Sequence, residues 1–346
     1  MQAQDVASGT MLTASRSRPV AAYRTALWLA LLTYPLVPGM LFRSRNLVGA
    51  SPVLAALCLL LSYAWSISGP IAAWLTLYET DRGKVNRREQ PQIAREAILA
   101  AIGAPFFVLT AAVLAWFHWT TYQTAIWYAL LAGVASARFL PPPESRPAVS
   151  ETMWRLHHVS ALLLLVFGVA HVGNHLAAVE SLSAHVTVQN ILRVVYRQPV
   201  IETVIAITAL LQVWTGWMLV SRARWQRATR LRNTQLLAGA FLGMFFVSHL
   251  TGVFISGRLI QNADTTFAWA TGGPAGLLSN PRSPQMIPYY SLAVLALVLH
   301  AGSASRWSLA PVLGQLVAQR ICYALIALGI IVTLVLLLPM SGFHLA

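Results

Sequence analysis

Long apolar stretches alternate with short polar segments along the whole chain. A helix that crosses a bilayer needs about 20 predominantly apolar residues. Nine stretches come close to or exceed that length, and the fourth and eighth are the shortest: 22–42, 51–78, 95–117, 122–140, 155–178, 199–221, 233–256, 287–305 and 319–340. The pattern predicts an all-α, polytopic membrane helical bundle of about nine transmembrane helices.

Composition agrees with a membrane protein. Hydrophobic residues make up 57% of the 346 residues and charged residues only 10%, whereas soluble domains carry about 25% charged residues. A net charge of +14 would suggest nucleic acid in a soluble chain. Here the arginines lie in short loops between apolar stretches, where they set topology. We therefore expect the lipid bilayer and no nucleic acid as a partner.

The distribution of Lys and Arg predicts an orientation. With nine helices, 18 of the 24 basic residues fall on one side of the membrane. Basic loops stay in the cytoplasm, so we expect a cytoplasmic N-terminus and an external C-terminus, in a bacterial inner membrane. The two cysteines, Cys58 and Cys322, are too few for an iron–sulfur cluster.

A proline-rich run, 141–147, cannot continue a helix and marks a boundary. We expect residues 1–140 to form a four-helix membrane extension of unassigned role, residues 141–152 a linker, and residues 153–346 a five-helix bundle. We expect no acidic residue within a span of the N-terminal part.

Three histidines, His171, His249 and His300, lie well inside apolar stretches. Ionisable side chains in the bilayer are costly and mark functional sites, and facing imidazoles in a helical bundle are what haem b iron requires. His171 and His249 lie 16 and 17 residues from the cytoplasmic ends of their helices, about 25 Å in at 1.5 Å per residue. Gln212 and His300 share a second depth in the inner half.

Small residues accompany the histidines. Gly168 and Gly252 lie within one turn of His171 and His249, which would leave room for a porphyrin face. The alternative is plain helix packing, which small residues also promote in membranes. The outer histidines His118, His175, His185 and His344 are scattered over four segments, so we do not expect them to form a metal site.

Residues 153–340 resemble the five-helix, di-haem cytochrome b membrane anchors of succinate dehydrogenase and fumarate reductase. The resemblance is carried by short motifs: Arg155-Leu156-His157, His171 followed by Asn174-His175, then Gln235, Gly239, His249, and His300 followed by Trp307.

This resemblance implies that His171 and His249 are the ligands of an outer haem b and that His300 is a ligand of an inner one. The family's partner for His300 falls where this chain has Gln212. Because Gln is a poor iron ligand, the inner haem would be absent or five-coordinate. We expect one haem b and leave the second open.

A quinone site is expected at the cytoplasmic membrane edge. Donors and an aromatic side chain gather there, and could bind both quinone carbonyls: Trp154, Arg155, His157, His158 and Ser160. The alternative is an interfacial anchor. On the outer side, Glu202 would either pass protons to a quinone or cap its helix, where the dipole favours an anion.

These patterns favour a haem b membrane subunit that transfers electrons between a partner oxidoreductase and the quinone pool. The sequence has no Gly-rich dinucleotide motif and no cysteine cluster, so substrate oxidation would belong to peripheral subunits docked on the cytoplasmic face. The alternative is a haem-free relative of the scaffold that acts as an assembly, sensor or transport protein. Gln212 and the additional N-terminal helices favour this alternative.

Overall fold

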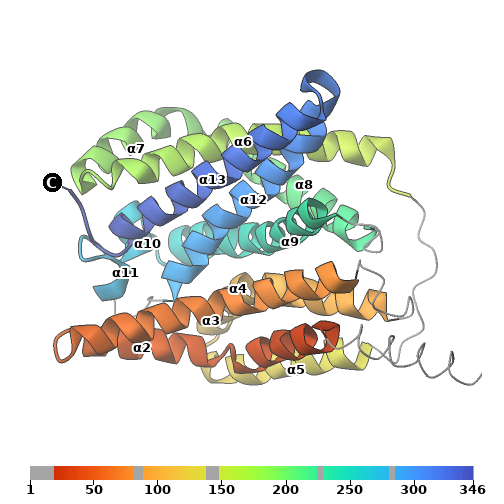
Figure 1. The fold of residues 1–346 in the computed structure, drawn as a ribbon. Helices are drawn as coiled ribbons and strands as arrows, with labels where there is room; N and C mark the ends of the chain where they lie inside the picture. The colour runs from red at the N-terminus through yellow and green to blue at the C-terminus, as the bar shows by residue number, and fades with distance from the viewer. Residues whose placement is uncertain (1–18, 81–88, 138–147, 224–228, 280–284, 346) are drawn as a thin grey trace, which may run out of the picture.

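The computed structural model describes residues 19–80, 89–137, 148–223, 229–279 and 285–345. Within these ranges the chain is helical and contains no strand. Figure 1 shows long helices lying side by side in two groups, with α2–α5 on one side and α6–α13 on the other.

Among the described residues, seven helices are long and apolar enough to cross a membrane. They are α3 (Pro52–Glu79), α4 (Gln90–Trp116), α6 (Glu151–Ala177), α8 (Pro199–Ser221), α9 with its continuation η5 (Arg230–Ile260), α12 (Met286–Leu313) and α13 (Gln315–Met340). The architecture is thus all-helical and compatible with an integral membrane protein.

An eighth span depends on a bent pair. The helix Pro19–Thr33 and α2 (Leu36–Leu47) meet at an angle of 63°, where the sequence predicts one continuous helix. Pro35 stands at the junction, and its missing N–H and bulky ring break the helical hydrogen bonding there.

The expected count of nine is not confirmed. The expected span 122–140 contains η2 (Thr120–Tyr122) and α5 (Gln123–Ser136). Helix α5 has only 14 residues, fewer than the ~20 needed to cross a bilayer, and residues 138–147 lie outside the described ranges. The described residues therefore support seven spans, or eight with the bent pair.

The N-terminal group has a core of aromatic and small side chains. Trp127 of α5 is 1% exposed, packs against Tyr34 and Phe107, and donates its indole N–H to the Leu31 carbonyl at 2.8 Å. A buried hydrogen bond of this kind satisfies the polar end of a large apolar side chain.

The expectation of no acidic residue within the N-terminal spans is wrong. Glu96 lies inside α4 and is 2% exposed. Arg24 donates to both carboxylate oxygens at 2.6 Å, and Gln92 donates to one of them at 3.1 Å. The pairing explains how a carboxylate is accommodated in an apolar helix, because buried charges require a partner.

The two groups meet along α9, which packs against α4 and α3. Two indole N–H groups donate across this contact, Trp74 to Thr234 and Trp116 to Ser256, each at 3.0 Å. Tyr63 also donates to Ser291 of α12 at 2.9 Å. The N-terminal group therefore covers one side of the C-terminal bundle.

Three short helices complete one end of the C-terminal group: α7 (Leu182–Tyr196), α10 (Phe267–Thr271) and α11 (Gly276–Ser279). This end is called the outer end and the opposite one the inner end, after the orientation that the sequence predicts. The sequence pattern does not predict α7, which follows α6 after a short turn and is capped by Ser181. The predicted span 287–305 is too short, because α12 continues to Leu313.

Candidate functional site

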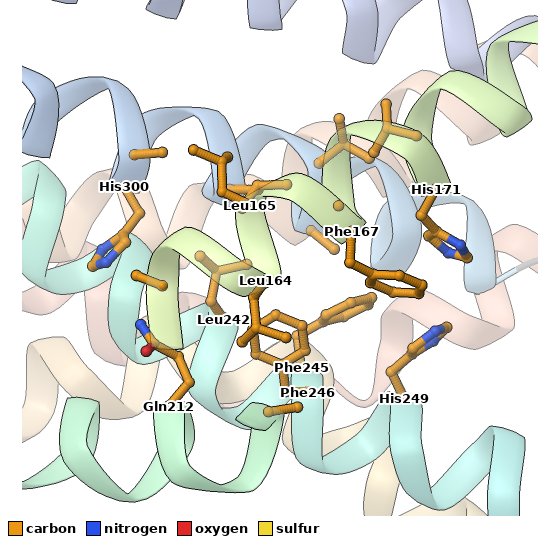
Figure 2. A pocket seen from close by; sticks show the side chains of 18 of the residues that line it. Leu164, Leu165, Phe167, His171, Gln212, Leu242, Phe245, Phe246, His249 and His300 are labelled. Carbon is orange, nitrogen blue, oxygen red and sulfur yellow. The ribbon is translucent and has the colours of Figure 1, made fainter. Parts of the chain in front are cut away.

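A cavity of about 780 Å³ runs through the C-terminal bundle. Helices α6, α8, α9 and α12 supply most of its lining, which is apolar except for histidines and a few polar groups. Figure 2 shows His300 and Gln212 at one end, His171 and His249 at the other, and leucine and phenylalanine side chains between them. The volume falls within the ~300–1,000 Å³ range of cofactor and ligand pockets.

At the outer end, two imidazoles from different helices approach each other. His171 of α6 and His249 of α9 have ring centroids 6.3 Å apart and an interplanar angle of 67°. Each ring stacks on the phenylalanine one turn before it: Phe167 at 5.4 Å and Phe245 at 5.2 Å. These stacks hold both rings at the cavity wall.

Two further histidines join this end. His175 and His171 have their Nε2 atoms 3.2 Å apart, and the ring of His185 from α7 stacks on His175 at 5.5 Å. Asn174 lies 3.2 Å from Nε2 of His185. Burial lowers the pKa of His185 to about 4, so its imidazole is neutral near pH 7. The apolar pattern does not predict that His175 and His185 lie close together, because it does not predict helix α7, which carries His185.

The remaining outer histidines lie elsewhere. His344 bonds the Ala178 carbonyl through Nδ1 at 2.6 Å, and His118 is an exposed residue with a φ of 58° after α4. Among the described residues, no three side chains of metal-binding type converge as they would around a bare ion. A haem needs only two protein ligands, since the porphyrin supplies the other four nitrogens.

At the inner end, His157 of α6 is held by a chain of hydrogen bonds. The Thr215 hydroxyl donates to the Leu211 carbonyl at 2.8 Å, so the contact at 3.0 Å between Nδ1 of His157 and Thr215 uses the ring N–H as donor. Nε2 of His157 then accepts from the Gln212 amide at 3.3 Å. The amide oxygen of Gln212 accepts from Ser160.

His300 of α12 is the second imidazole at this end. Its Nδ1 lies 2.8 Å from the Gln235 carbonyl, to which it donates. Its ring rests against Gly239, where a Cβ would lie 2.7 Å from ring atoms. The sequence predicts that Gln212 faces His300. Both line this end of the cavity, but the ring contact is with His157, at 6.4 Å between centroids and 85° between planes.

The predicted glycines differ in their surroundings. Gly168 lines the cavity, and a Cβ there would meet only Leu297, at 3.8 Å. A Cβ at Gly252 would have no atom within 4 Å, and Gly252 is not part of the cavity wall. Gly243, one turn after Gly239, lines the cavity in open space. Of the two predicted glycines, the structure thus brings only Gly168 to the cavity.

The expected quinone residues separate into two sets. Trp154 and His158 stack at 5.8 Å and line the inner opening, with the Arg232 guanidinium 6.0 Å from the indole. Arg155 does not line the opening. It forms an exposed ion pair with Glu151 at 2.6 Å. His157 and Ser160 lie deeper, in the Gln212 network.

Glu202 is part of a charged cluster at the outer opening. It accepts from Arg258 at 2.8 Å, and its helix has no side-chain cap. Nearby, Arg193 of α7 makes two bonds of 2.9 Å to Asp264, and Arg197 adds a third at 3.3 Å. The Arg193 hydrogen bonds lower the pKa of Asp264. This cluster ties α7 to the loop before α10 and closes the outer end.

Helix α9 changes type just after His249. Residues Thr251–Ile260 form a π-helix, η5, a rare conformation that is frequent at functional sites. The wider turn directs Arg258 to Glu202 at the outer opening. The sequence does not predict this π-helix, because the change concerns hydrogen-bond register and leaves the apolar pattern intact.

Comparison of the chain with protein-family models, with characterised proteins and with solved structures finds no match. Function is therefore inferred from the geometry of the cavity.

Proposed function

We propose that this protein is a haem b membrane subunit that transfers electrons between a partner oxidoreductase and the quinone pool. The observation that carries the proposal is the pair His171 and His249, 6.3 Å apart between ring centroids at the wall of a large cavity. An iron–nitrogen bond of about 2 Å, with the ring centre about 1 Å beyond the nitrogen, puts two axial imidazoles about 6 Å apart.

The surrounding residues fit a planar, apolar cofactor. The wall between the two ends is built from leucine and phenylalanine side chains (Figure 2). At this wall a Cβ at Gly243 would have no atom within 4 Å, and one at Gly168 would meet only Leu297, at 3.8 Å. Phe167 and Phe245 keep the histidines at the wall. A haem bound there would supply a one-electron redox centre, and the apolar wall would keep water from it.

Quinone binding is best placed at the inner opening. Trp154 and His158 provide an aromatic face and an N–H donor, and Arg232 provides a cation beside them. A quinone needs a flat apolar contact and donors to its carbonyls, and this set supplies both. The excess of basic residues on the expected cytoplasmic side supports an inner opening that faces the cytoplasm of a bacterium.

The chain itself would not oxidise a substrate. Electrons would come from, or go to, peripheral subunits on the cytoplasmic face, because this sequence has no flavin or iron–sulfur motif. The enzyme would be the whole complex, with this chain as its non-catalytic membrane part.

Haem content per chain tests the proposal. His171→Ala and His249→Ala should each remove one haem, as measured by the pyridine haemochrome of the purified protein. His118→Asn is the matched control, because His118 is exposed and does not line the cavity, and Asn tolerates its left-handed backbone. His175→Ala should keep the haem. If only His175→Ala removed it, the assignment of His171 would be wrong.

A haem-free protein, purified from cells supplied with iron and haem precursors, would favour the alternative. The scaffold would then serve as a membrane assembly, sensor or transport protein. One observation favours this alternative: Gln212 already provides a hydrogen bond to Nε2 of His157 without a cofactor.

A further inference from the structure

Helix α7 lies beside α6 at the outer end of the bundle, where the apolar pattern of the sequence predicts no helix. We propose that α7 is a half-membrane helix: it enters the outer leaflet of the bilayer, its apolar face contacts lipid acyl chains, and its polar face forms part of the cavity wall. This proposal adds a lipid contact to the fold and does not depend on whether the cavity binds a haem.

Helix α7 runs back along α6 towards the inner end. Near the start of α7, Nε2 of His185 lies 3.2 Å from the amide nitrogen of Asn174, which is close to the end of α6. At the end of α7, the ring of Tyr196 contacts that of Phe167 at 5.8 Å between centroids. Asn174 and Phe167 are seven residues apart on α6, or about 10 Å. The end of α7 therefore lies deeper than its start, and Figure 1 shows the two helices side by side.

A tight turn leads from α7 directly into α8. The backbone N–H of Gln198 donates to the Val195 carbonyl at 3.2 Å, and the Gln198 carbonyl accepts from the Glu202 N–H at 2.9 Å. The side-chain amide of Gln198 donates to the Val194 carbonyl at 3.0 Å. These bonds satisfy backbone groups at the turn within the protein, as a turn inside the bilayer requires. Helix α8 thus begins at the depth at which α7 ends.

The polarity of α7 is opposite to that of a helix on an aqueous surface, which exposes its polar side. His185 and Gln189 are only 1% and 5% exposed and line the cavity. Arg193 points to Asp264, to which it donates two bonds of 2.9 Å. The apolar side chains of the deeper half face outward, with exposed fractions of 59% to 69%: Ile191, Val194 and Val195.

The exposed face becomes more apolar with depth. Its members up to residue 190 are Ser183, Val186, Thr187 and Asn190, of which three are polar. Only aliphatic residues follow in α7, and Val200 and Val204 continue the exposed apolar surface on α8. Within Leu182–Tyr196, which the structure describes throughout, no exposed residue is charged. This gradient fits a helix that starts at the membrane edge and ends among acyl chains.

The neighbouring helix also indicates lipid as the occupant of this face. Helix α6 is long and apolar enough to cross a membrane. At the level of its contact with α7, Val166 and Val169 of α6 are also largely exposed, as expected for residues that face lipid. Because α7 packs against α6 at this level, the exposed valines of both helices would meet the same acyl chains.

The arginines of this segment are paired, as cations at membrane depth require. Arg193 bonds to Asp264, and Arg197 lies 3.3 Å from Asp264 and 4.0 Å from Glu202. All of these partners lie on the side of α7 that faces the cavity mouth. The charges therefore do not oppose contact between the outward face and lipid.

Nitroxide spin labels on the full-length protein in proteoliposomes test the lipid contact. Val194→Cys is labelled in a Cys58→Ser background, and the Cys58→Ser parent measures any labelling of the buried Cys322. The label at residue 194 should collide freely with oxygen, which dissolves in lipid. It should collide several-fold less with a water-soluble nickel chelate than a label in Ser183→Cys, the control at the exposed start of the same helix.

A label in Val169→Cys gives the reference for a lipid-facing residue of α6. Ile191→Cys, which is equally exposed on α7, replaces Val194→Cys if that variant does not fold. High oxygen and low nickel access at residue 194, as at residue 169, would support the half-membrane helix.

Two results would overturn the proposal. Equal access of the nickel chelate to residues 194 and 183 would show that α7 lies in water. Low access of both oxygen and nickel, with an immobilised label, would show that protein covers this face. Dipolar broadening that disappears on dilution with unlabelled protein would then identify the cover as a second copy of the chain. Neither result would affect the proposed function, which is tested by haem content.

Discussion

At the scale of single residues, the environment of each histidine determines what it can bind. His300 is fixed by one hydrogen bond to a backbone carbonyl and by contact with a glycine. His249 has no hydrogen-bond partner recorded among the described residues and is held by stacking on Phe245. The inner histidine is therefore positioned by specific polar contacts and the outer one by apolar packing.

The contact between Gly239 and His300 gives the first prediction. Gly239→Ala should displace the imidazole, because a Cβ would lie 2.7 Å from it, and overpacking costs about 1–3 kcal/mol. The thermal midpoint of the purified protein should therefore fall. Gly173→Ala is the matched control, because Gly173 also lies within a helix, α6, does not line the cavity, and would have no atom within 4 Å of an added Cβ.

In Gly173→Ala the thermal midpoint should stay the same or rise, since Ala is favoured over Gly in a helix by about 1 kcal/mol. Equal effects of the two substitutions would show that the Gly239 contact does not position His300.

The sequence predicts which histidines face the cavity better than it predicts their partners. His171, His249 and His300 are identified by depth alone, and all three line the cavity. The contact of His300 with His157 depends on the tilt and rotation of α6 and α12, which apolar periodicity does not determine. One signal is present in the sequence: residues 157 and 171 are nearly four turns apart and so share a helix face.

At the scale of helices, boundaries follow from the apolar pattern where Pro or Gly marks an end. The predicted span 199–221 coincides with α8, and 51–78 differs from α3 by one residue at each end. The bend at Pro35, the π-helix after His249 and α7 are not predicted. Pro35 is visible in the sequence but lies inside an apolar stretch, so the apolar pattern alone predicts one continuous helix there. The π-helix and α7 depend on backbone hydrogen bonding and on packing, and neither of these alters the order of apolar and polar residues along the chain.

The ion pair between the helix Pro19–Thr33 and α4 gives the second prediction. Arg24→Gln should strongly destabilise the protein, because removing one partner of a buried pair costs about 3–5 kcal/mol. Arg24 is 31% exposed, so solvent screening should place the loss at the lower end of that range. The measurement is the denaturation midpoint in detergent.

An exposed pair serves as the control. Glu151→Gln removes the partner of Arg155. The side chain of Glu151 is 78% exposed and that of Arg155 is 76% exposed, and exposed ion pairs contribute about 0–1 kcal/mol to stability. A loss of equal size in both variants would mean that burial of Glu96 does not matter to the stability of the N-terminal group.

At the scale of the whole molecule, the N-terminal group covers one side of the C-terminal bundle through α9 and α12. Its role in function is not assigned by its residues. Its position gives it a structural role, since Trp74, Trp116 and Tyr63 bond to the helices that carry His249 and His300.

The third prediction concerns the topology. If α5 completes a ninth span, the loop at His118 and the segment after Ala137 lie on opposite sides of the membrane, and Ala346 lies outside. His118→Cys and Ser145→Cys, each in a Cys58→Ser, Cys322→Ser background, should then be labelled by a membrane-impermeant maleimide from opposite faces of sealed vesicles. Labelling from the same face would reduce the number of spans and reverse the expected position of the C-terminus.

The reduced-minus-oxidised absorbance spectrum of the purified wild-type protein tests the central claim most directly. If His171 and His249, whose rings lie 6.3 Å apart at the cavity wall, are haem ligands as proposed, the spectrum should show the sharp bands of low-spin, bis-histidine haem b, and these bands should be lost when both histidines are replaced by Ala. A flat difference spectrum from protein produced with ample haem would contradict the account.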